Sequence, residues 1–426
     1  MVNVLTRPKP VTKRTARVPY RIYISVNGEG YGHSSRALAV ARQFDPECVF
    51  LGSYGYVLER LQRAGYATVE VGPEVRFFGE DGAFELSKII LKNSNWPLVV
   101  TRQTREEARI MKENGITCVI SDCRSAAVFA AAKLGLPCIF MTNQTQFDHF
   151  FQRRNQEEFE PDLGRLRSRR SRKLAEAPKA IQEAILHGAA EPSVEMAARA
   201  VFREIDEIVI ADFPPPDTIC LPVLSHKPQV MKMQRIVGPV TAWKAESVIP
   251  RLRFHNAPYV VGTLGGHQYR LPLFQALIEA AHRLPDVQFE LFSSFEAVNV
   301  PPNLHLLDFT DNPECYYKAA DLVVTQAGHS TAMELLTLGK PSLLVPDYKQ
   351  FEQESNAFRM VELGVSSQIT YPELSGAVLA NRIQHHLRTR TYEINALRLA
   401  RQAASLDGAR RVAEIVTDYA MRVIAY

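Results

Sequence analysis

The chain has 426 residues, of which 46% are hydrophobic and 23% are charged, and its formal net charge is +4. This length suits two domains better than one, and the composition is that of an ordinary globular protein. The small net charge gives no indication of nucleic-acid binding. The six cysteines form no Cys-X-X-Cys pair, which argues against a zinc site and favours a reducing compartment.

Residues 1–19 are basic and contain prolines, without the apolar core that a signal peptide requires. We expect this segment to be a flexible tail. No apolar stretch of the sequence is long enough to cross a bilayer. The sequence therefore predicts a cytoplasmic protein, and any contact with the inner face of the cell membrane would be peripheral.

Residues 20–239 alternate short β-branched runs with helix-like segments, the pattern of a parallel sheet covered by helices. Helices are expected at Ser34–Gln43 and Ser125–Leu134. The predicted strands are Arg21–Val26, Cys48–Leu51, Ala67–Val71, Thr117–Ser121, Pro137–Met141 and Glu207–Ala211. We interpret this part of the chain as a first Rossmann-like domain.

An arginine-rich stretch of about 151–200 interrupts this alternation, because it is polar and helix-prone. Its most basic part runs from Arg165 to Lys173. One interpretation is a solvated helical face. The other is a patch for anionic lipid head groups or a pyrophosphate-linked lipid, with about 1 kcal/mol from each basic side chain. The predicted strand Glu207–Ala211 comes next, and the prolines at 214–216 then mark a loop.

The segment Gln234–Pro250 is expected to connect the domains, and the α/β pattern then restarts over residues 240–410. Predicted helices are Leu271–Arg283, Ser330–Leu338 and Gln353–Leu363. Predicted strands are Tyr259–Thr263, Gln288–Phe292, His305–Leu307, Leu322–Thr325 and Ser342–Val345. A final helix at 411–426 is expected to pack back on the first domain. This pattern predicts two open sheets with a cleft between them. Ligands bind such sheets beyond the carboxyl ends of the strands.

The loop after the first strand of each domain contains several glycines. The first loop runs from Asn27 to Arg36, and its glycines allow a ligand to approach the backbone and the next helix N-terminus. His33 at the start of that helix is a candidate general base, although a capping or packing role would also explain it. The second loop, Gly262–Gln268, has amides that can cradle a diphosphate, but it lacks the Lys-Ser/Thr of a Walker loop.

Two further loops complete a candidate nucleotide-sugar pocket. Gln326–Leu335 ends a strand in a glycine turn and begins a helix whose N-terminus attracts phosphate. Glu334, one turn into that helix, can accept hydrogen bonds from both ribose hydroxyls, unless it is merely a solvated helix residue. Pro346–Asn356 carries donors and acceptors that suit sugar hydroxyls.

In this order and spacing, the four loops resemble those of the inverting GT-B glycosyltransferases related to MurG, and most closely a MurG-like group common in archaea. The resemblance rests on GEGYGHSSR at 28–36, Ser121-Asp122, Asn143-Gln144, Phe213–Pro216 with Thr218–Cys220, and Asp347 with Gln350–Gln353. It extends from Arg21 to the C-terminus. Each motif alone is common, whereas the combination is specific.

The resemblance implies a GT-B fold of two Rossmann-like domains and a role for each matching position. His33 would act at the acceptor hydroxyl, in an acceptor side that also contains Gly30, Gly32, Asp122 and Asn143. The C-terminal domain would bind the donor: the diphosphate at Gly265, Gly266 and His267, phosphate at Gly328, His329, Ser330 and Thr331, the ribose at Glu334, and the transferred sugar at Glu352, Gln353 and Asn356. His267 departs from the family, which usually has a small hydroxyl residue there.

The resemblance implies hexosyl or N-acetylhexosaminyl transfer from a UDP-sugar, either UDP-GlcNAc or a UDP-hexose. The acceptor would be a hydroxyl of a lipid-linked or other glycan, and the sugar's configuration would invert. A lipid-linked acceptor favours the membrane interpretation of the Arg165–Lys173 cluster. The sequence contains no DxD motif of the metal-dependent type, so no metal cofactor is expected.

Two other functions stay open at this point. A non-hydrolysing UDP-sugar 2-epimerase also holds a UDP-sugar between two Rossmann-like domains, but His33 and the segment 350–356 favour transfer. A catalytically inactive nucleotide-sugar-binding subunit is the second alternative, and the presence of a candidate base argues against it. The sequence identifies neither the sugar, the base of the nucleotide, the acceptor nor the oligomeric state.

Overall fold

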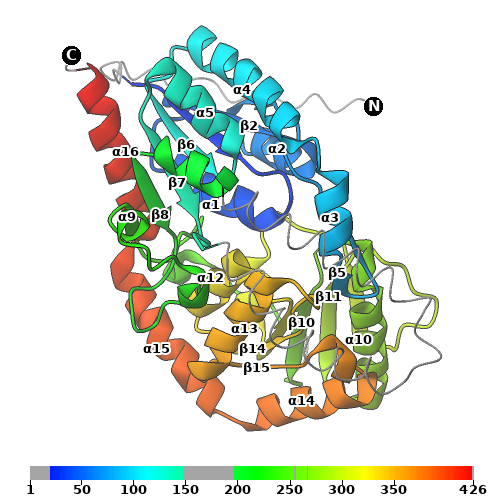
Figure 1. The fold of residues 1–426 in the computed structure, drawn as a ribbon. Helices are drawn as coiled ribbons and strands as arrows, with labels where there is room; N and C mark the ends of the chain where they lie inside the picture. Colours follow the sequence, from blue (N-terminus) through cyan, green and yellow to red (C-terminus); the bar gives the residue numbers. More distant parts are fainter. Residues whose placement is uncertain (1–19, 147–195, 254–255, 266, 425–426) are drawn as a thin grey trace, which may run out of the picture.

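Two parallel β-sheets organise the chain, which is seen here in a computed structural model that describes residues 20–146, 196–253, 256–265 and 267–424 (Figure 1). The first sheet has the order β3-β2-β1-β6-β7-β8-β9. Its strands are β1 (Ile22–Val26), β2 (Val49–Ser53), β3 (Ala67–Glu70), β6 (Cys118–Asp122), β7 (Cys138–Thr142), β8 (Glu207–Ile210) and β9 (Gln234–Ile236). Every residue of β1, β6, β7 and β8 is buried, as expected for parallel strands covered on both faces.

Helices cover this sheet and connect its strands. They are α1 (Tyr31–Ala41), α2 (Gly55–Arg63), α3 (Leu86–Lys92), α4 (Trp96–Glu113), α5 (Ser125–Leu134) and the single turn α9 (Pro228–Met231). A small antiparallel hairpin, β4 (Gly79–Glu80) with β5 (Ala83–Phe84), lies between β3 and α3 in the chain. The core has one layer on each side of the sheet, the first around α1 and the second around α4 and α5.

The second sheet repeats this design with the order β12-β11-β10-β13-β14-β15. Its strands are β10 (Tyr259–Thr263), β11 (Gln288–Phe292), β12 (Leu304–Leu307), β13 (Leu322–Thr325), β14 (Ser342–Leu344) and β15 (Ser366–Gln368). Its helices are α10 (Leu271–Arg283), α11 (Glu314–Ala319), α12 (His329–Thr337), α13 (Phe351–Glu362), α14 (Gly376–Arg388) and α15 (Thr391–Leu406). In each sheet the first strand of the domain, β1 or β10, lies in the middle of the sheet and is followed by a glycine loop and a helix.

The last helix returns to the first domain. Helix α16 (Gly408–Ile424) contacts α1 and β6, and Val412, Val416 and Ala420 are fully buried in the core that contains β1. Figure 1 shows α15 and α16 as one long arm beside both domains. The apolar face of α16 therefore joins the end of the chain to the sheet that carries the first glycine loop.

The predicted strands and helices are confirmed, with ends that coincide or differ by up to three residues. One prediction is wrong in part: the interdomain connection was expected to begin at Gln234, whereas Gln234–Ile236 forms the edge strand β9. Its residues are two half-buried ones around the exposed Arg235, and they leave no clear hydrophobic pattern, which is why this strand escapes sequence analysis. Within the described part of the chain, no helix has the length and apolar character needed to span a membrane. The Arg165–Lys173 cluster lies outside the described residues.

Candidate active site

The N-termini of two helices meet between the domains. Helix α1 follows β1 in the first domain, and α12 follows β13 in the second. A Cβ atom at Gly32 would stand 2.6 Å from Ser330 Oγ, so only glycine allows this approach. Because the first amides of a helix are unpaired and carry partial positive charge, two such ends together favour an anion.

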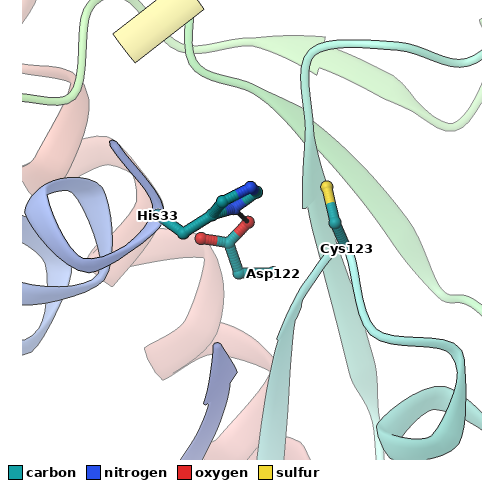
Figure 2. A group of neighbouring side chains, drawn as sticks. All are labelled: His33, Asp122 and Cys123. Carbon is teal, nitrogen blue, oxygen red and sulfur yellow. Dashed lines mark hydrogen bonds and ion pairs between the residues drawn. The ribbon is translucent and has the colours of Figure 1, made fainter. Parts of the chain in front are cut away.

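His33 lies at this junction, in the first turn of α1, and points toward Asp122 at the end of β6 (Figure 2). The imidazole Nδ1 is 3.0 Å from Asp122 Oδ1. The His33 side chain is 22% exposed, whereas Asp122 is fully buried. The structure therefore gives the candidate base a buried carboxylate partner and leaves its ring accessible.

Arg36 is the third member of this group. It is one helical turn after His33, and its guanidinium donates from Nε to Asp122 Oδ2 over 2.9 Å and from Nη2 to Oδ1. Burial alone would raise the pKa of Asp122, but Arg36 and then His33 outweigh burial and lower this pKa to about 2. Asp122 is therefore ionised at neutral pH.

An ionised Asp122 determines which nitrogen of His33 carries the proton. Arg36 Nη2 also lies 3.0 Å from Nδ1, but this group already donates to Asp122. The stronger interaction is Nδ1–H donating to the carboxylate, an assignment made from the hydrogen bonds. The lone pair then resides on Nε2. This arrangement matches the orienting role that a carboxylate has beside a catalytic histidine.

The thiol of Cys123 is the remaining group beside His33 and Asp122 (Figure 2). The three side chains bring potential metal-ligating atoms within 4.8 Å of one another. However, burial raises the pKa of the Cys123 thiol to about 11, and the Arg36 guanidinium already neutralises Asp122. A protonated thiol beside a fixed cation is a poor metal site, so this group fits a base with its orienting partner better than a metal centre.

Glu334, the predicted ribose ligand, lies on α12 and faces α1. Its carboxylate accepts a hydrogen bond from the Ser35 hydroxyl, and the side chain is only 9% exposed. Burial raises the pKa of Glu334 to about 7, although the positive charge of Arg60 opposes this effect.

Two predicted residues from opposite domains contact each other. Asn143, which follows β7, donates from Nδ2 to Glu352 Oε1 over 2.8 Å. Asn356, one turn further along α13, donates to the same oxygen over 3.3 Å and to the carbonyl of Ala327 over 3.0 Å. The predicted acceptor side and the predicted sugar loop therefore come together in the structure.

Gln353 has a supporting position rather than a free amide. Its Oε1 accepts the Asp347 amide hydrogen over 2.9 Å, and its Nε2 donates to Asp347 Oδ2 over 3.1 Å. Asp347 in turn forms a buried ion pair with Arg270, whose Nη1 donates to the carbonyl of Leu264 over 2.6 Å. Gln353 is thus held by Asp347, and a direct contact with a sugar would require it to leave this residue.

The predicted phosphate ligands of α12 divide into two kinds. Ser330 and Thr331 are partly exposed at the helix start, whereas His329 is 3% exposed and its Nε2 lies 3.0 Å from Asp212 Oδ2. The imidazole of His329 is therefore engaged, and a contact of its backbone amide with phosphate stays a prediction. Its side chain is turned into the interface because Asp212, a buried carboxylate of the first domain, accepts its hydrogen bond.

The second glycine loop is described except for Gly266, which lies outside the described residues. Gly265 has a φ of 62°, and a Cβ there would stand 2.3 Å from Arg270 Nη1, so the loop is folded over this guanidinium. His267 stacks on the ring of Tyr269. Burial and the nearby Arg270 lower the pKa of His267 to about 4, so this imidazole is neutral at pH 7.

In the first glycine loop, Gly30 lies at the N-cap of α1 and has a φ of 126°.

The hairpin β4–β5 of the first domain is hydrogen-bonded to two donor-side loops of the second. The amide of Phe84 donates to the Tyr348 carbonyl over 2.7 Å, and the Tyr348 amide donates to the Gly82 carbonyl over 2.8 Å. The Gly82 amide also donates to the Tyr269 carbonyl. The hairpin thereby connects the segments just after Gln268 and within Pro346–Asn356 to the first domain.

Sequence reasoning missed Arg36, Asp212 and Arg270 as parts of the site. A signal was present for Arg36, because a residue three positions after His33 lies on the same face of a helix. Asp212 follows the apolar run Glu207–Ala211, and a polar residue at a strand end was the signal there. For Arg270 no pattern in the sequence indicates its pairing with Asp347, which is 77 residues away.

Comparisons with known proteins show that the chain is similar to glycosyltransferases. Residues 281–412 match the glycosyltransferase family 28 C-terminal domain. A glycosyltransferase of Methanosarcina acetivorans is 29% identical over 93% of this chain and 96% of its own length. The UDP-N-acetylglucosamine–N-acetylmuramyl-(pentapeptide) pyrophosphoryl-undecaprenol N-acetylglucosamine transferase of Sulfurihydrogenibium is 31% identical over 30% of this chain and 38% of its own length.

Among solved structures, MurG of Acinetobacter baumannii superposes with a TM-score of 0.56. The alignment covers 94% of this chain and all of that chain, at 17% identity, so this similarity concerns the fold. The expected GT-B fold, with two Rossmann-like domains that face each other, is thereby confirmed. The chain has the GT-B fold and is similar to MurG-like glycosyltransferases, with a match to the family 28 C-terminal domain over residues 281–412.

Proposed function

We propose that this glycosyltransferase moves a hexosyl or N-acetylhexosaminyl group from a UDP-sugar, UDP-GlcNAc or a UDP-hexose, to a hydroxyl of a lipid-linked or other glycan acceptor. Transfer inverts the anomeric centre and needs no metal ion. The observation that carries this proposal is the junction of α1 and α12, where His33 stands beside two helix N-termini that touch at Gly32 and Ser330. The proposed base, His33, thus lies next to the helix N-termini that would bind the donor's diphosphate.

The reaction needs one displacement. His33 Nε2 takes the proton of the acceptor hydroxyl, the hydroxyl oxygen bonds to the anomeric carbon, and the bond from that carbon to the β-phosphate oxygen breaks. Asp122 stabilises the resulting imidazolium through Nδ1–H. The departing UDP meets the amides at the starts of α12 and α1, which stabilise its charge without a cation.

Several features support the donor assignment. The family 28 match covers the third and fourth loops, with Glu334 available for a ribose and the Glu352 region for the sugar. The relative of known activity named above uses UDP-N-acetylglucosamine, although it matches only 30% of this chain. The preference for a lipid-linked acceptor, with contact to an anionic membrane through the Arg165–Lys173 cluster, rests on the family resemblance.

The helix junction can be tested with a pair of substitutions. Gly32→Ala places a methyl group against Ser330 and should force the helix starts apart, because both Oγ and Cβ of Ser330 lie within 2.7 Å of it. We expect the rate of transfer from UDP-sugar to fall at least tenfold. In a Ser330→Gly background, the same change at Gly32 should have a much smaller effect, because the obstructing atoms are gone.

Independent effects of the two substitutions would contradict the proposed shared site. Gly115→Ala is a suitable control, since the space around Gly115 is open; its φ of 61° introduces strain in the turn before β6, at the opposite end of this strand from Asp122. Circular dichroism of each variant distinguishes loss of the junction from loss of the fold.

A further inference from the structure

Asp212 is a buried carboxylate that follows β8, and the loop after it folds around its two oxygens. Oδ1 accepts the amide hydrogens of Phe213 over 2.6 Å and Ile219 over 3.2 Å. Oδ2 accepts the amide hydrogen of Cys220 over 2.8 Å. This carboxylate therefore has a fixed position in the first domain, and three backbone donors stabilise its negative charge.

His329 is the one side chain of the second domain that is hydrogen-bonded to Asp212 among the residues that the structure describes. The distance from Nε2 to Oδ2 is 3.0 Å, between residues 117 positions apart, and both side chains are at least 97% buried. Because the carboxylate accepts at both oxygens, Nε2–H is the donor. The first residue of α12 is thus attached to the opposite domain.

The neighbours of His329 are the part of α12 assigned to the donor diphosphate. Ser330 touches Gly32 of α1, and Thr331 follows on the same partly exposed turn. The position of these groups depends on where the helix starts relative to α1. A hydrogen bond at the first residue of α12 that crosses the domain boundary controls this relation.

We propose that Asp212 is a positioning residue for the transfer reaction: through His329 it holds the N-terminus of α12 against the first domain, so that the diphosphate site is complete only when the domains are closed. This inference rests on the proposed function. Asp212 touches neither donor nor acceptor in this scheme. It acts through a hydrogen bond that domain opening would break.

A metal ion is a weaker explanation of the same side chains. The Cys220 thiol joins Asp212 and His329 to give three potential ligating atoms within 4.8 Å of one another. Burial raises the pKa of this thiol well above its ordinary value, which keeps it protonated. The amide hydrogens that point at both oxygens of Asp212 would also repel a cation. The donors present therefore suit a histidine–carboxylate pair.

The test compares substitutions on both sides of the pair in the full-length protein, with UDP affinity measured by calorimetry and turnover measured with a UDP-sugar. Asp212→Asn retains an oxygen for the amides of Phe213 and Ile219 but presents an NH₂ group to Nε2–H and to the Cys220 amide. His329→Leu removes the donor, whereas His329→Gln keeps an N–H group near the position of Nε2. We expect roughly tenfold weaker UDP binding for Asp212→Asn and His329→Leu, and a change of less than threefold for His329→Gln.

The double variant Asp212→Asn/His329→Leu should bind UDP no more weakly than either single variant, because the same interaction is lost. Asp217→Asn is the matched control, since Asp217 lies in the same loop and also pairs with the second domain, but through Arg398 of α15 over 2.8 Å and not through the start of α12. It should leave UDP affinity unchanged. Equal weakening by Asp217→Asn would indicate that any disturbance of the loop suffices, and would overturn the proposal.

Additive losses in the double variant, or wild-type affinity in both single variants, would also overturn it. Comparison of His329→Gln with His329→Leu keeps the test valid if Asp212→Asn destabilises its loop, because neither change disturbs the amides at Asp212. If the wild-type protein binds no UDP and transfers no sugar, the proposed function itself fails. If it binds UDP and the variants behave like the wild type, only the role of Asp212 fails.

Discussion

Replacing Glu334 with glutamine should stabilise the protein above neutral pH and weaken its binding of UDP. The carboxyl group has an ordinary pKa of 4.5, and burial between α12 and α1 raises this pKa to about 7. Between these pH values the folded protein binds more protons than the unfolded chain, so the contribution of Glu334 to stability falls as the pH rises. The stabilising contribution of Glu334 is fully present below pH 4.5 and is lost once the pH exceeds about 7.

The shift from 4.5 to about 7 corresponds to about 3 kcal/mol of destabilisation in the ionised form. Glutamine has nearly the same shape and does not titrate. The free energy of unfolding of Glu334→Gln should therefore exceed that of the wild type by up to about 3 kcal/mol at pH 8, and by much less at pH 5. Denaturant unfolding at both pH values measures the difference, and Glu113→Gln on the exposed face of α4 is the control.

The same substitution tests the ribose contact. Two ribose hydroxyls would donate to an ionised Glu334, and hydrogen bonds to charged groups contribute about 1.5–3 kcal/mol each before compensation by water. Calorimetry should show UDP binding at least tenfold weaker in Glu334→Gln or Glu334→Ala. A stability difference that does not change between pH 5 and pH 8 would refute the account of its burial. Unchanged UDP affinity would remove Glu334 from the donor site.

Three further predictions concern the mechanism and the membrane. His33→Ala should reduce single-turnover transfer by about 10²–10⁴-fold and change UDP-sugar affinity little, and a near wild-type rate would make His33 structural. EDTA should leave transfer intact, because helix amides and not a cation stabilise the departing UDP; activity that is lost with EDTA and restored by magnesium or manganese would contradict this. Replacing Arg167, Arg169, Arg170 and Arg172 with glutamine should decrease sedimentation of the protein with anionic liposomes. Binding that is insensitive to this change and to salt would show that the cluster is a plain solvated face.

The sequence predicts most of the framework because each parallel strand is a short apolar run and each glycine loop follows such a run. The strands Tyr259–Thr263, Gln288–Phe292 and Leu322–Thr325 have the predicted ends. Short edge strands such as β9 and β15 are not predicted, because three residues, most of them polar, leave no hydrophobic period to detect.

The candidate site is predicted less completely, for a different reason. Positions within one loop, such as His33 and Gly32, can be recognised from local sequence, and the structure brings both to the domain junction. Pairs between distant segments cannot be read in this way. The contact of Asn143 with Glu352 joins residues 209 positions apart, and that of Asp212 with His329 joins two domains. These pairs depend on how the domains close.

The central claim is inverting, metal-free transfer from a UDP-sugar, and time-resolved proton NMR tests it most directly. The protein is incubated in EDTA with UDP-GlcNAc and UDP-hexoses, both alone and with polyprenyl-linked glycan acceptors. Our account predicts that UDP is released and that the sugar, whether transferred to the acceptor or slowly to water, first appears as the β-anomer from an α-linked donor. First appearance of the α-anomer, conversion of UDP-GlcNAc to UDP-ManNAc, or tight UDP binding without any turnover would contradict it.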